Sequence, residues 1–189
     1  MRLSEPRIPA LKDDEWDETA AEIMQPFVAQ GRVFNIFRTL ANHPDLARRW
    51  LVFGNHILGK STLSARDREM LILRIGYLCQ SGYEWGQHVL ISKGLKMSDE
   101  EIRLCQTGPS TEGISDYDRL LLTAVDELHG DAHVSDATWA GLSEHLDRQQ
   151  MMDLVFTVGQ YNLVSMALNS FGVQPDDGLP SWEIWERDI

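Results

Sequence analysis

Helix-start signals recur along almost the whole chain, and they constrain its fold more than any other feature of the sequence. Ser, Asp or Asn residues that can cap a helix precede segments in which apolar residues recur with a helical period. No segment shows the alternating apolar and polar pattern of a strand bounded by turn residues. The sequence therefore predicts an all-α protein.

The expected helices can be placed by their terminal residues. Helices are predicted after these caps: Asp13 or Asp14, with a helix to about Gly31; Asn42 or His43, with Pro44 in the first turn; Ser64; Ser81; Ser98; Ser115; Ser135, with a helix through His145; and Asp147, with a last helix to about Ser170. Gly94 and Gly172 are predicted to end helices, and Gly108 with Pro109 predicts a loop.

Residues 70–78, with the sequence MLILRIGYL, are apolar almost all round, which predicts a central helix buried on several sides. Arg74 lies within this segment, so its guanidinium must be paired. Its partner is either a glutamate of the protein or a substrate carboxylate, and the sequence leaves both alternatives open.

Charge and cysteine content limit the partners and the compartment. The formal net charge of −12 and the absence of a basic face argue against nucleic acid or anionic lipid as a partner. No apolar run has the 18 or so residues of a membrane span. The first residues lack the apolar core of a secretory signal, and two cysteines cannot form a disulfide framework. We therefore expect a soluble cytoplasmic protein.

One structural unit is expected, because the chain is long enough for one domain with a full core or for a domain with an added N-terminal arm. The tail, residues 176–189, carries Trp182 and Trp185 without enough partners for a core of its own. We expect this tail to pack on the body or on a neighbouring subunit.

Four polar residues fall on two consecutive expected helices at fixed spacing. Ser81 follows Glu69 by twelve residues, and Glu84 and His88 follow Ser81 by three and seven. Glu84 lies one helical turn before His88, so its carboxylate can orient the imidazole and favour its protonated form. In a plainer interpretation Ser81 and Glu84 form a capping box, Glu69 compensates a helix dipole, and His88 is a satisfied core histidine.

This spacing resembles that of the carboxymuconolactone decarboxylase and alkyl hydroperoxidase D (AhpD) superfamily. In the hydroperoxidase branch the slots of Ser81 and Glu84 hold the two cysteines of a C-x-x-C redox pair, and the glutamate and histidine form a proton relay. In the decarboxylase branch an E-W-x-x-H run is typical, which Glu84, Trp85 and His88 reproduce. Because neither slot is sulfur in this chain, the residues favour acid–base chemistry over thiol chemistry.

The resemblance covers residues 64–104 and, more weakly, residues 161–173. It also implies that residues 1–60 form a helical extension packed on the core and that residues 61–175 form the main helical domain. It implies an AhpD-like helical bundle that forms a homotrimer or homohexamer and needs neither cofactor nor metal. The activity it implies is an acid–base lyase or decarboxylase acting on a small carboxylated lactone or aromatic-catabolism intermediate. Two alternatives stay open: an AhpD-like peroxidase, and a non-catalytic ligand-binding or structural oligomer.

Roles follow for the catalytic residues if the chain is an acid–base enzyme. We expect His88 to be the general acid or base, Glu84 to tune and orient it, and Glu69 to relay a proton. Arg74 or Ser81 is expected to bind a carboxylate or a developing oxyanion.

Other residues near the motif are expected to meet the substrate. Tyr83 and Trp85, together with Arg74, are predicted to bind it. Arg74, Arg68 and Lys93 are the cations near the motif that could attract an anionic substrate.

The two cysteines and the remaining histidines give weaker signals. Cys79 and Cys105 miss both slots of the redox pair, which predicts buried inert thiols. A recycling peroxidase needs an attacking thiolate and a resolving partner, so it would require these two cysteines to meet.

Glu84 with His88, and His129 with His133, are each half of a metal site, but no further ligands cluster with them.

Overall fold

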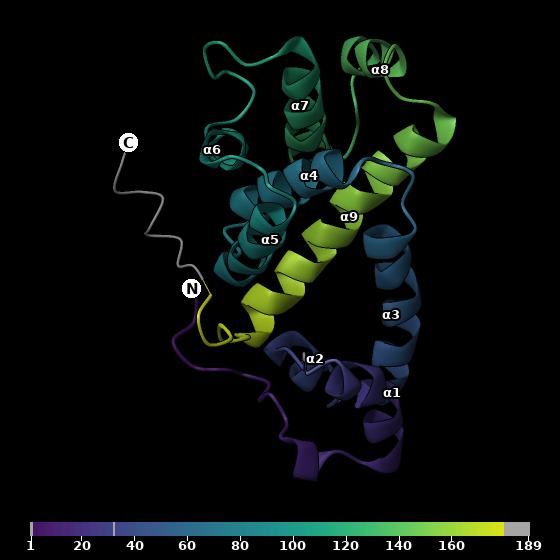
Figure 1. The fold of residues 1–189 in the computed structure, drawn as a ribbon, viewed down its shortest axis with the longest axis vertical. Coiled ribbons are helices and arrows are strands. Elements are labelled where there is room, and N and C mark those ends of the chain that lie inside the picture. Colours follow the sequence, from purple (N-terminus) through teal and green to yellow (C-terminus); the bar gives the residue numbers. More distant parts are fainter. Residues whose placement is uncertain (1, 32, 180–189) are drawn as a thin grey trace.

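The computed structural model describes residues 2–31 and 33–179, and over these residues it is all-helical with no strand, as the sequence predicts (Figure 1). A short 3-10 helix, Asp13–Glu15, is followed by α1 (Glu18–Ala29), α2 (Asn35–Leu40), α3 (Pro44–Gly59), α4 (Ala65–Leu78), α5 (Gly82–Gly94), α6 (Asp99–Thr107), α7 (Asp116–Asp131), α8 (Asp136–Ser143) and α9 (Arg148–Phe171). Trp182 and Trp185 lie outside the described residues. No helix in the described part is long and apolar enough to cross a membrane.

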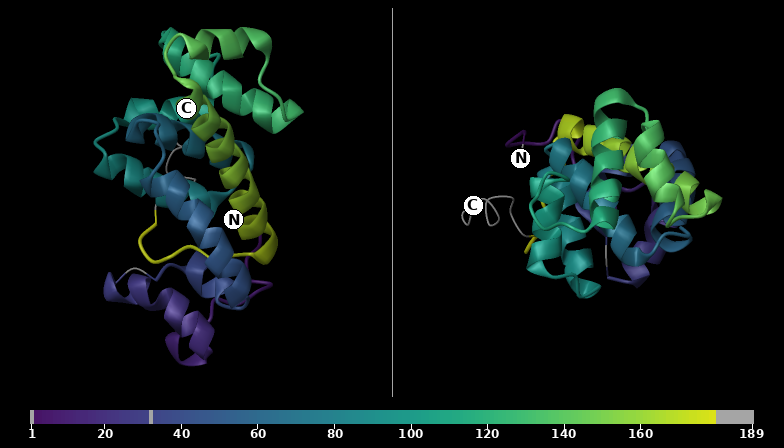
Figure 2. Two further views of the ribbon diagram at one scale, coloured as in Figure 1. Left: turned by 90° about the vertical axis from the view of Figure 1, so that its right-hand side faces the viewer. Right: turned by 90° about the horizontal axis from the view of Figure 1, so that it is seen from above.

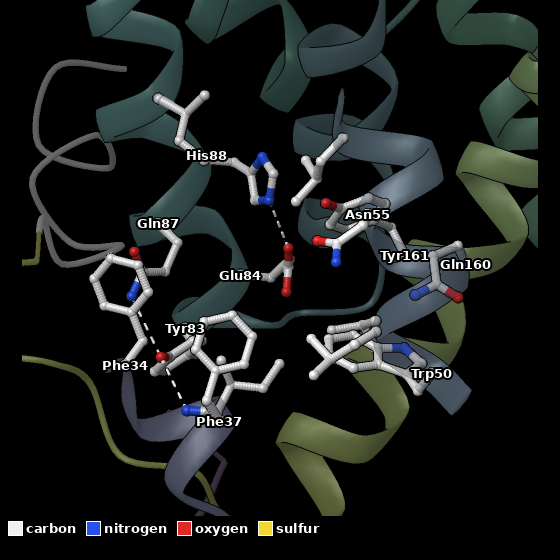
Figure 3. Close-up of a pocket in the computed structure, with 16 residues that line it drawn as sticks. Phe34, Phe37, Trp50, Asn55, Tyr83, Glu84, Gln87, His88, Gln160 and Tyr161 are labelled. Atoms are coloured by element: carbon white, nitrogen blue, oxygen red, sulfur yellow. Dashed lines mark hydrogen bonds and ion pairs between the residues drawn. The ribbon is translucent and has the colours of Figure 1, made fainter. Parts of the chain in front are cut away.

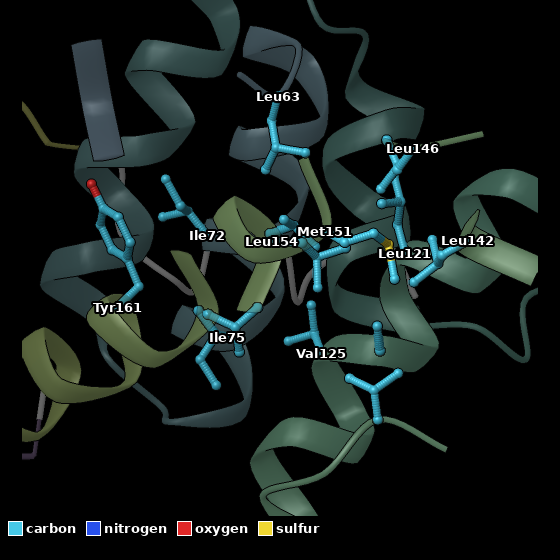
Figure 4. Packing of buried hydrophobic residues seen from close by; sticks show 14 of the residues in the cluster. Leu63, Ile72, Ile75, Leu121, Val125, Leu142, Leu146, Met151, Leu154 and Tyr161 are labelled. Carbon is cyan, nitrogen blue, oxygen red and sulfur yellow. The ribbon is translucent and has the colours of Figure 1, made fainter. Parts of the chain in front are cut away.

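Helix α4 is the centre of the molecule. It packs against α5, α6, α7 and α9, and every residue from Glu69 to Gly76 is buried. One face of α4 contributes Leu71, Ile72 and Ile75 to a cluster with residues of α7, α8 and α9 (Figure 4). The opposite face contributes Met70 and Leu73 to a second cluster with residues of α5 and α6. Burial on several sides is therefore as the apolar sequence predicts.

The remaining helices frame this centre. Helices α7 and α8 lie at one end of the molecule and α1 and α2 at the other, with the long helix α9 running between them (Figures 1 and 2). Helix α3 contacts α1, α2 and α9, so it links the N-terminal helices to the rest of the fold. The N-terminal segment also pairs with the end of α9, where the amides of Arg7 and Ile8 donate to the carbonyl of Phe171.

Most predicted helix caps are confirmed. The side chains that accept a hydrogen bond from the first turn of their helix are His43, Ser64, Ser98, Ser115, Ser135 and Asp147. Gly172 ends α9 with a φ of 71°, and Gly108 ends α6 with a φ of 82°.

Gly94 is the last residue of α5, as predicted, and the left-handed residue beyond the helix is Lys96, with a φ of 65°. Two predicted boundaries are wrong. The first long helix begins at Glu18 behind the cap Asp17, because Asp13 and Asp14 form the separate 3-10 turn. Helix α8 ends at Ser143, before His145. The short helix α2 was not predicted, because its first turn has no capping side chain.

Arg74 is paired inside the protein. Its guanidinium donates to both carboxylate oxygens of Asp126 at 2.7 and 2.8 Å, and to the carbonyls of Cys105 and Gln106 at 3.2 and 2.8 Å. These carbonyls belong to the last turn of α6, where unsatisfied oxygens favour a cation. Arg74 thus fixes α6 and α7 on α4.

Gly108 allows this arrangement because it lies against the guanidinium. A Cβ atom at Gly108 would lie 2.5 Å from the Nη2 atom of Arg74. The φ of 82° and ψ of −169° at this residue are a combination open essentially to glycine. Gly113 also has a positive φ, of 78°, but a Cβ atom there would meet nothing within 4 Å.

We predict that Gly108→Ala lowers the free energy of unfolding by roughly 3 kcal/mol and that Gly113→Ala lowers it by about 1 kcal/mol. Both substitutions place a side chain at positive φ, but only the first also displaces a buried, paired guanidinium. Chemical denaturation of the two variants beside the parent protein measures the difference. Equal losses would show that the contact between Gly108 and Arg74 does not constrain the fold.

Candidate active site

His88 lies between two carboxylates. Its Nδ1 atom is 2.6 Å from Oε2 of Glu69, and its Nε2 atom is 2.9 Å from Oε1 of Glu84. Glu69 comes from α4, whereas Glu84 and His88 lie one turn apart on α5, which packs directly against α4. The three residues are therefore brought together by one helix pair, as their spacing predicts. All three are buried.

The two carboxylates hold a proton on the imidazole. Burial alone lowers the pKa of His88, but the charge of Glu69 and the hydrogen bonds to Glu69 and Glu84 outweigh it and raise this pKa from 6.5 to about 10. With an acceptor at each ring nitrogen, both nitrogens act as donors in the imidazolium form. His88 is thus an imidazolium at neutral pH.

Glu69 is fixed on its other side by Arg68. The Nε atom of Arg68 donates to Oε1 of Glu69 at 3.1 Å, and the side chain of Glu69 is fully buried. Charges therefore alternate in the order Arg68, Glu69, His88, Glu84. Such a line of paired charges can hold a proton at one end and move it along hydrogen bonds already made.

A pocket of about 140 Å³ begins where this line ends (Figure 3). Glu84 and His88 are the two charged residues of its wall. Aromatic rings, aliphatic side chains and three amides make up most of the rest. The lining residues are Phe34, Ile36, Phe37, Trp50, Leu51, Gly54, Asn55, Leu58, Tyr83, Glu84, Gln87, His88, Ile91, Gln160, Tyr161 and Val164. They come from α3, α5, α9 and the segment around α2. In Figure 3 the Glu84 carboxylate lies centrally among them.

Two tyrosines of the pocket are held as neutral phenols. The ring of Tyr161 meets the His88 ring edge to face, with centroids 4.9 Å apart. Burial, and then the charges of Glu84 and Glu69, raise the pKa of Tyr161 well above its ordinary value. Burial and a hydrogen bond to Asp176 likewise raise the pKa of Tyr83.

Asp176 lies behind the pocket wall and accepts hydrogen bonds from two residues that form it. Its Oδ2 atom accepts from the Tyr83 hydroxyl at 2.5 Å and from the Gln87 amide at 2.8 Å, and its Oδ1 atom accepts from the backbone amide of Asn35. The start of the predicted tail therefore packs on the body, and it fixes the orientation of two pocket residues.

Three other predicted site residues lie away from this pocket. Arg74 is bound to Asp126 and to the end of α6, and it does not line the pocket. Trp85 is fully buried in the cluster between α4, α5 and α6. The capping-box interpretation of Ser81 is wrong, since its hydroxyl makes no cap hydrogen bond and is buried without a partner among the described residues.

The pocket walls contributed by α3 and α9 were missed by the sequence analysis. Trp50, Leu51, Gly54, Asn55 and Leu58 fall on one face of α3 at helical spacing. Their spacing places them on one face of the helix but cannot show that this face lies opposite His88.

The cysteines do not form a redox pair. Both are free thiols and belong to different hydrophobic clusters on opposite faces of α4. Burial raises the pKa of the Cys79 thiol, and it raises that of Cys105 to about 12. Thiolate formation is therefore disfavoured at neutral pH. Across the described residues, no group of three or more His, Cys, Asp or Glu side chains could hold a metal ion.

Comparisons with known proteins agree with this geometry. Residues 44–108 match the model of the carboxymuconolactone decarboxylase family, a segment that contains Glu69, Ser81, Glu84 and His88. No curated protein sequence matches the chain significantly.

Solved structures share the fold at low sequence identity. An uncharacterized peroxidase-related protein with an AhpD core from Ralstonia eutropha JMP134 has a TM-score of 0.78 at 20% identity, covering 91% of this chain and 93% of the other. A peroxidase-related protein from Silicibacter sp. TM1040 has a TM-score of 0.77 at 16% identity, covering 94% and 96%. The debrominase Bmp8, in complex with 2,3,4-tribromopyrrole, has a TM-score of 0.75 at 10% identity, covering 92% and 94%. Residues 44–108 are therefore similar to the carboxymuconolactone decarboxylase family, and the described part of the chain has the fold of the AhpD-like structures.

Proposed function

We propose that the chain is an acid–base enzyme that transfers protons to and from a small substrate in the pocket beside Glu84. The observation that carries this proposal is the hydrogen-bonded line of Glu69, His88 and Glu84, which is buried throughout and ends at the pocket. A purely structural histidine does not need a carboxylate at each nitrogen and an opening at one end. Perturbed ionisable groups that line a cavity are typical of catalytic sites.

The geometry favours roles that differ from those expected from the sequence. Both ring nitrogens of His88 are occupied by carboxylates, so a substrate cannot reach either nitrogen without breaking a bond. Glu84 has a second oxygen and lines the pocket. We therefore assign Glu84 as the group that exchanges a proton with substrate, His88 as the group that resupplies it, and Glu69 as the group that orients His88.

Decarboxylation of a small carboxylated lactone or aromatic-catabolism intermediate is the form of this chemistry that the family suggests. The bond to the carboxylate carbon breaks, CO₂ leaves, and the electron pair stays on the ring carbon. Glu84 takes a proton from the His88 imidazolium and delivers it to that carbon, and a proton from solvent then restores the imidazolium. This sequence needs proton delivery and no redox centre.

A thiol peroxidase is a less favoured candidate. It needs a thiolate near the pocket and a resolving partner. Neither cysteine lines the pocket, and burial raises the pKa of both thiols. A ligand-binding oligomer without catalysis is the remaining alternative, and it is distinguished by kinetics.

We predict that Glu84→Gln lowers kcat by about 10² to 10⁴ while the melting temperature changes little. The amide oxygen of Gln can still accept from His88, but the side chain cannot carry the proton. The measurement is turnover of a substrate found by screening lactones and aromatic-pathway intermediates, with thermal unfolding of the same samples.

Glu101→Gln is the matched control, because Glu101 caps α6 and pairs with Arg66 outside the site. This variant should lose stability and keep its activity per folded molecule. An active Glu84→Gln variant would contradict the proposal, and so would dithiol-dependent peroxide reduction that Cys79→Ser abolishes.

We further predict that the stability of the protein falls as pH rises from 7 to about 10, and that His88→Gln removes this decline. The folded state keeps the His88 proton up to a pKa of about 10, whereas the unfolded chain releases it near 6.5. The contribution of His88 is therefore complete below pH 6.5 and is lost as pH rises through the folded pKa. Denaturation curves across this range, with nitrogen-15 shifts of the imidazole, measure it. An imidazole that is neutral at pH 8 in the folded protein would refute the assignment.

A second copy of the chain is proposed as a partner, because one face of α9 is apolar and exposed. Met152, Phe156, Leu163 and Met166 are between 50 and 59% exposed, and with Gly159 they recur every three or four residues along one stripe.

The stripe continues onto α3 and lacks charge. Val52 and Phe53 extend it, and the ring of Phe53 packs edge to face on Phe156. Residues 154–171 contain no Asp, Glu, Lys, Arg or His, although the chain carries a net charge of −12. Two acidic copies can therefore approach here without opposing like charges. The six large side chains of the stripe expose on the order of 100 Å² each, about 600 Å² together, against roughly 800 Å² per partner in a standard interface.

The spacing of the stripe is nearly symmetric about Gly159. An antiparallel pairing places Gly159 opposite its copy, Phe156 opposite Leu163, and Met152 opposite Met166, which is the pattern of a two-fold contact. A hexamer contains such a contact, whereas a trimer alone does not.

We predict that Gly159→Arg converts the assembly to smaller species, because a long cation is placed where two helices meet. A Cβ atom at Gly159 meets nothing within 4 Å, so the fold of the single chain tolerates the change. Gly130→Arg is the control, since Gly130 is an equally open glycine on α7. Size-exclusion chromatography with light scattering measures the mass. A parent protein that is monomeric at micromolar concentration would contradict the interface.

A further inference from the structure

We infer that the pocket beside Glu84 binds an uncharged single-ring compound that donates a hydrogen bond, and that it rejects a carboxylate of the same shape. The inference rests on the proposed function for the claim that the reaction occurs in this pocket. It narrows the substrate class further than the family match does.

Among the residues that the structure describes, no Lys or Arg side chain lines the pocket. His88 carries a positive charge, but its two N–H groups donate to Glu69 and Glu84. The charged group that a ligand in the cavity would meet is therefore the negative carboxylate of Glu84.

The cations expected from the sequence are committed to other carboxylates. Arg68 donates to Glu69, and Arg74 donates to Asp126. Lys93 forms an ion pair with Asp99. None of these three cations lines the pocket, so none can balance a buried substrate anion.

A second carboxylate adds to the negative field. Asp176 lies behind Tyr83 and Gln87 and accepts hydrogen bonds from both side chains. An anionic ligand would thus face Glu84 in a weakly screened cavity with Asp176 behind the wall. Like charges about 4 Å apart in such surroundings repel strongly enough to reduce binding by at least tenfold.

The size of the cavity fits one ring. The cavity has about 140 Å³ of space. An apolar protein cavity of about 150 Å³ holds one benzene molecule. Rings of Phe34, Phe37, Trp50, Tyr83 and Tyr161 line it, which suits a flat apolar ligand.

Gln160 supplies an unused polar contact. Its side chain lines the pocket and is 5% exposed, yet among the described residues its amide has no hydrogen-bond partner. Because this amide has no bond to the protein that it must give up, a ligand that bonds to it gains affinity. Glu84 offers an acceptor and Gln160 both a donor and an acceptor, which matches a neutral ring substituent with N–H or O–H and C=O groups.

These features bear on the reaction class. The carboxylate of a carboxylated lactone would lie beside the Glu84 carboxylate, which must later protonate the same substrate, and the two negative charges would repel each other. An uncharged ring avoids that repulsion, and Glu84 with His88 can then shift a proton between two of its atoms. The inference therefore favours isomerisation, tautomerisation or elimination on a neutral ring over decarboxylation.

Benzamide and benzoate test the inference, because they have the same shape and differ in charge at pH 7.5. We expect benzamide to bind at least about tenfold more tightly than benzoate in titration calorimetry. Glu84→Gln should reduce that preference to less than about threefold, since it removes the opposing charge. Gln160→Leu should weaken benzamide binding by about tenfold, because it removes a hydrogen-bond partner.

Two tryptophan variants locate the binding. Trp50→Ala should weaken benzamide binding, because Trp50 lines the pocket, whereas Trp139→Ala should not, because Trp139 is an exposed residue of α8. Benzoate binding as tight as benzamide, or no binding of either compound at millimolar concentration, would overturn the inference. Neither result would contradict the proposed proton transfer through Glu69, His88 and Glu84, because the kinetics of Glu84→Gln test that proposal independently.

Discussion

The structure depends on the pairing of two charges buried in its central helix. Glu69 and Arg74 lie one turn and a half apart on α4, in a segment that is otherwise apolar. A buried charge without a partner costs several kcal/mol, so each must be met by a neighbouring helix. Arg74 is met by Asp126 of α7 and by the last carbonyls of α6, and Glu69 is met by His88 of α5. Charge pairing therefore constrains which helices surround α4 and in which register.

The same constraint gives the site its direction. Glu69 is paired with Arg68 on its other side, whereas Glu84 lines the pocket, so in the proposed mechanism the proton of His88 moves toward Glu84. A carboxylate in this position can carry a proton and is negatively charged once it has given that proton up, whereas a thiol there becomes a nucleophile only after it loses its proton. The proposed function and the proposed ligand class both depend on this carboxylate.

Local features were predicted well from the sequence and long-range ones were not. The caps at Ser64, Ser98 and Ser115 depend on neighbouring residues and were confirmed, as was the burial of α4. The grouping of Glu69, Glu84 and His88 was predicted because all three lie on two consecutive helices, α4 and α5. The walls formed by Trp50 and its neighbours depend on how α3 and α9 pack around α5, which no local pattern encodes. The partner of Arg74 stayed open for the same reason.

Ser81 shows how far spacing alone can mislead. Ser81 and Glu84 stand at the two positions that hold cysteines in the C-x-x-C motif, but they differ in whether they line the pocket. Ser81 is fully buried and does not line the pocket, whereas Glu84 does. The reason is geometric, since Ser81 precedes the first turn of α5 and Glu84 lies within it, on the face that carries His88. Only one of the two slots reaches the cavity, so under the proposed function a ligand there meets a single carboxylate with the histidine behind it.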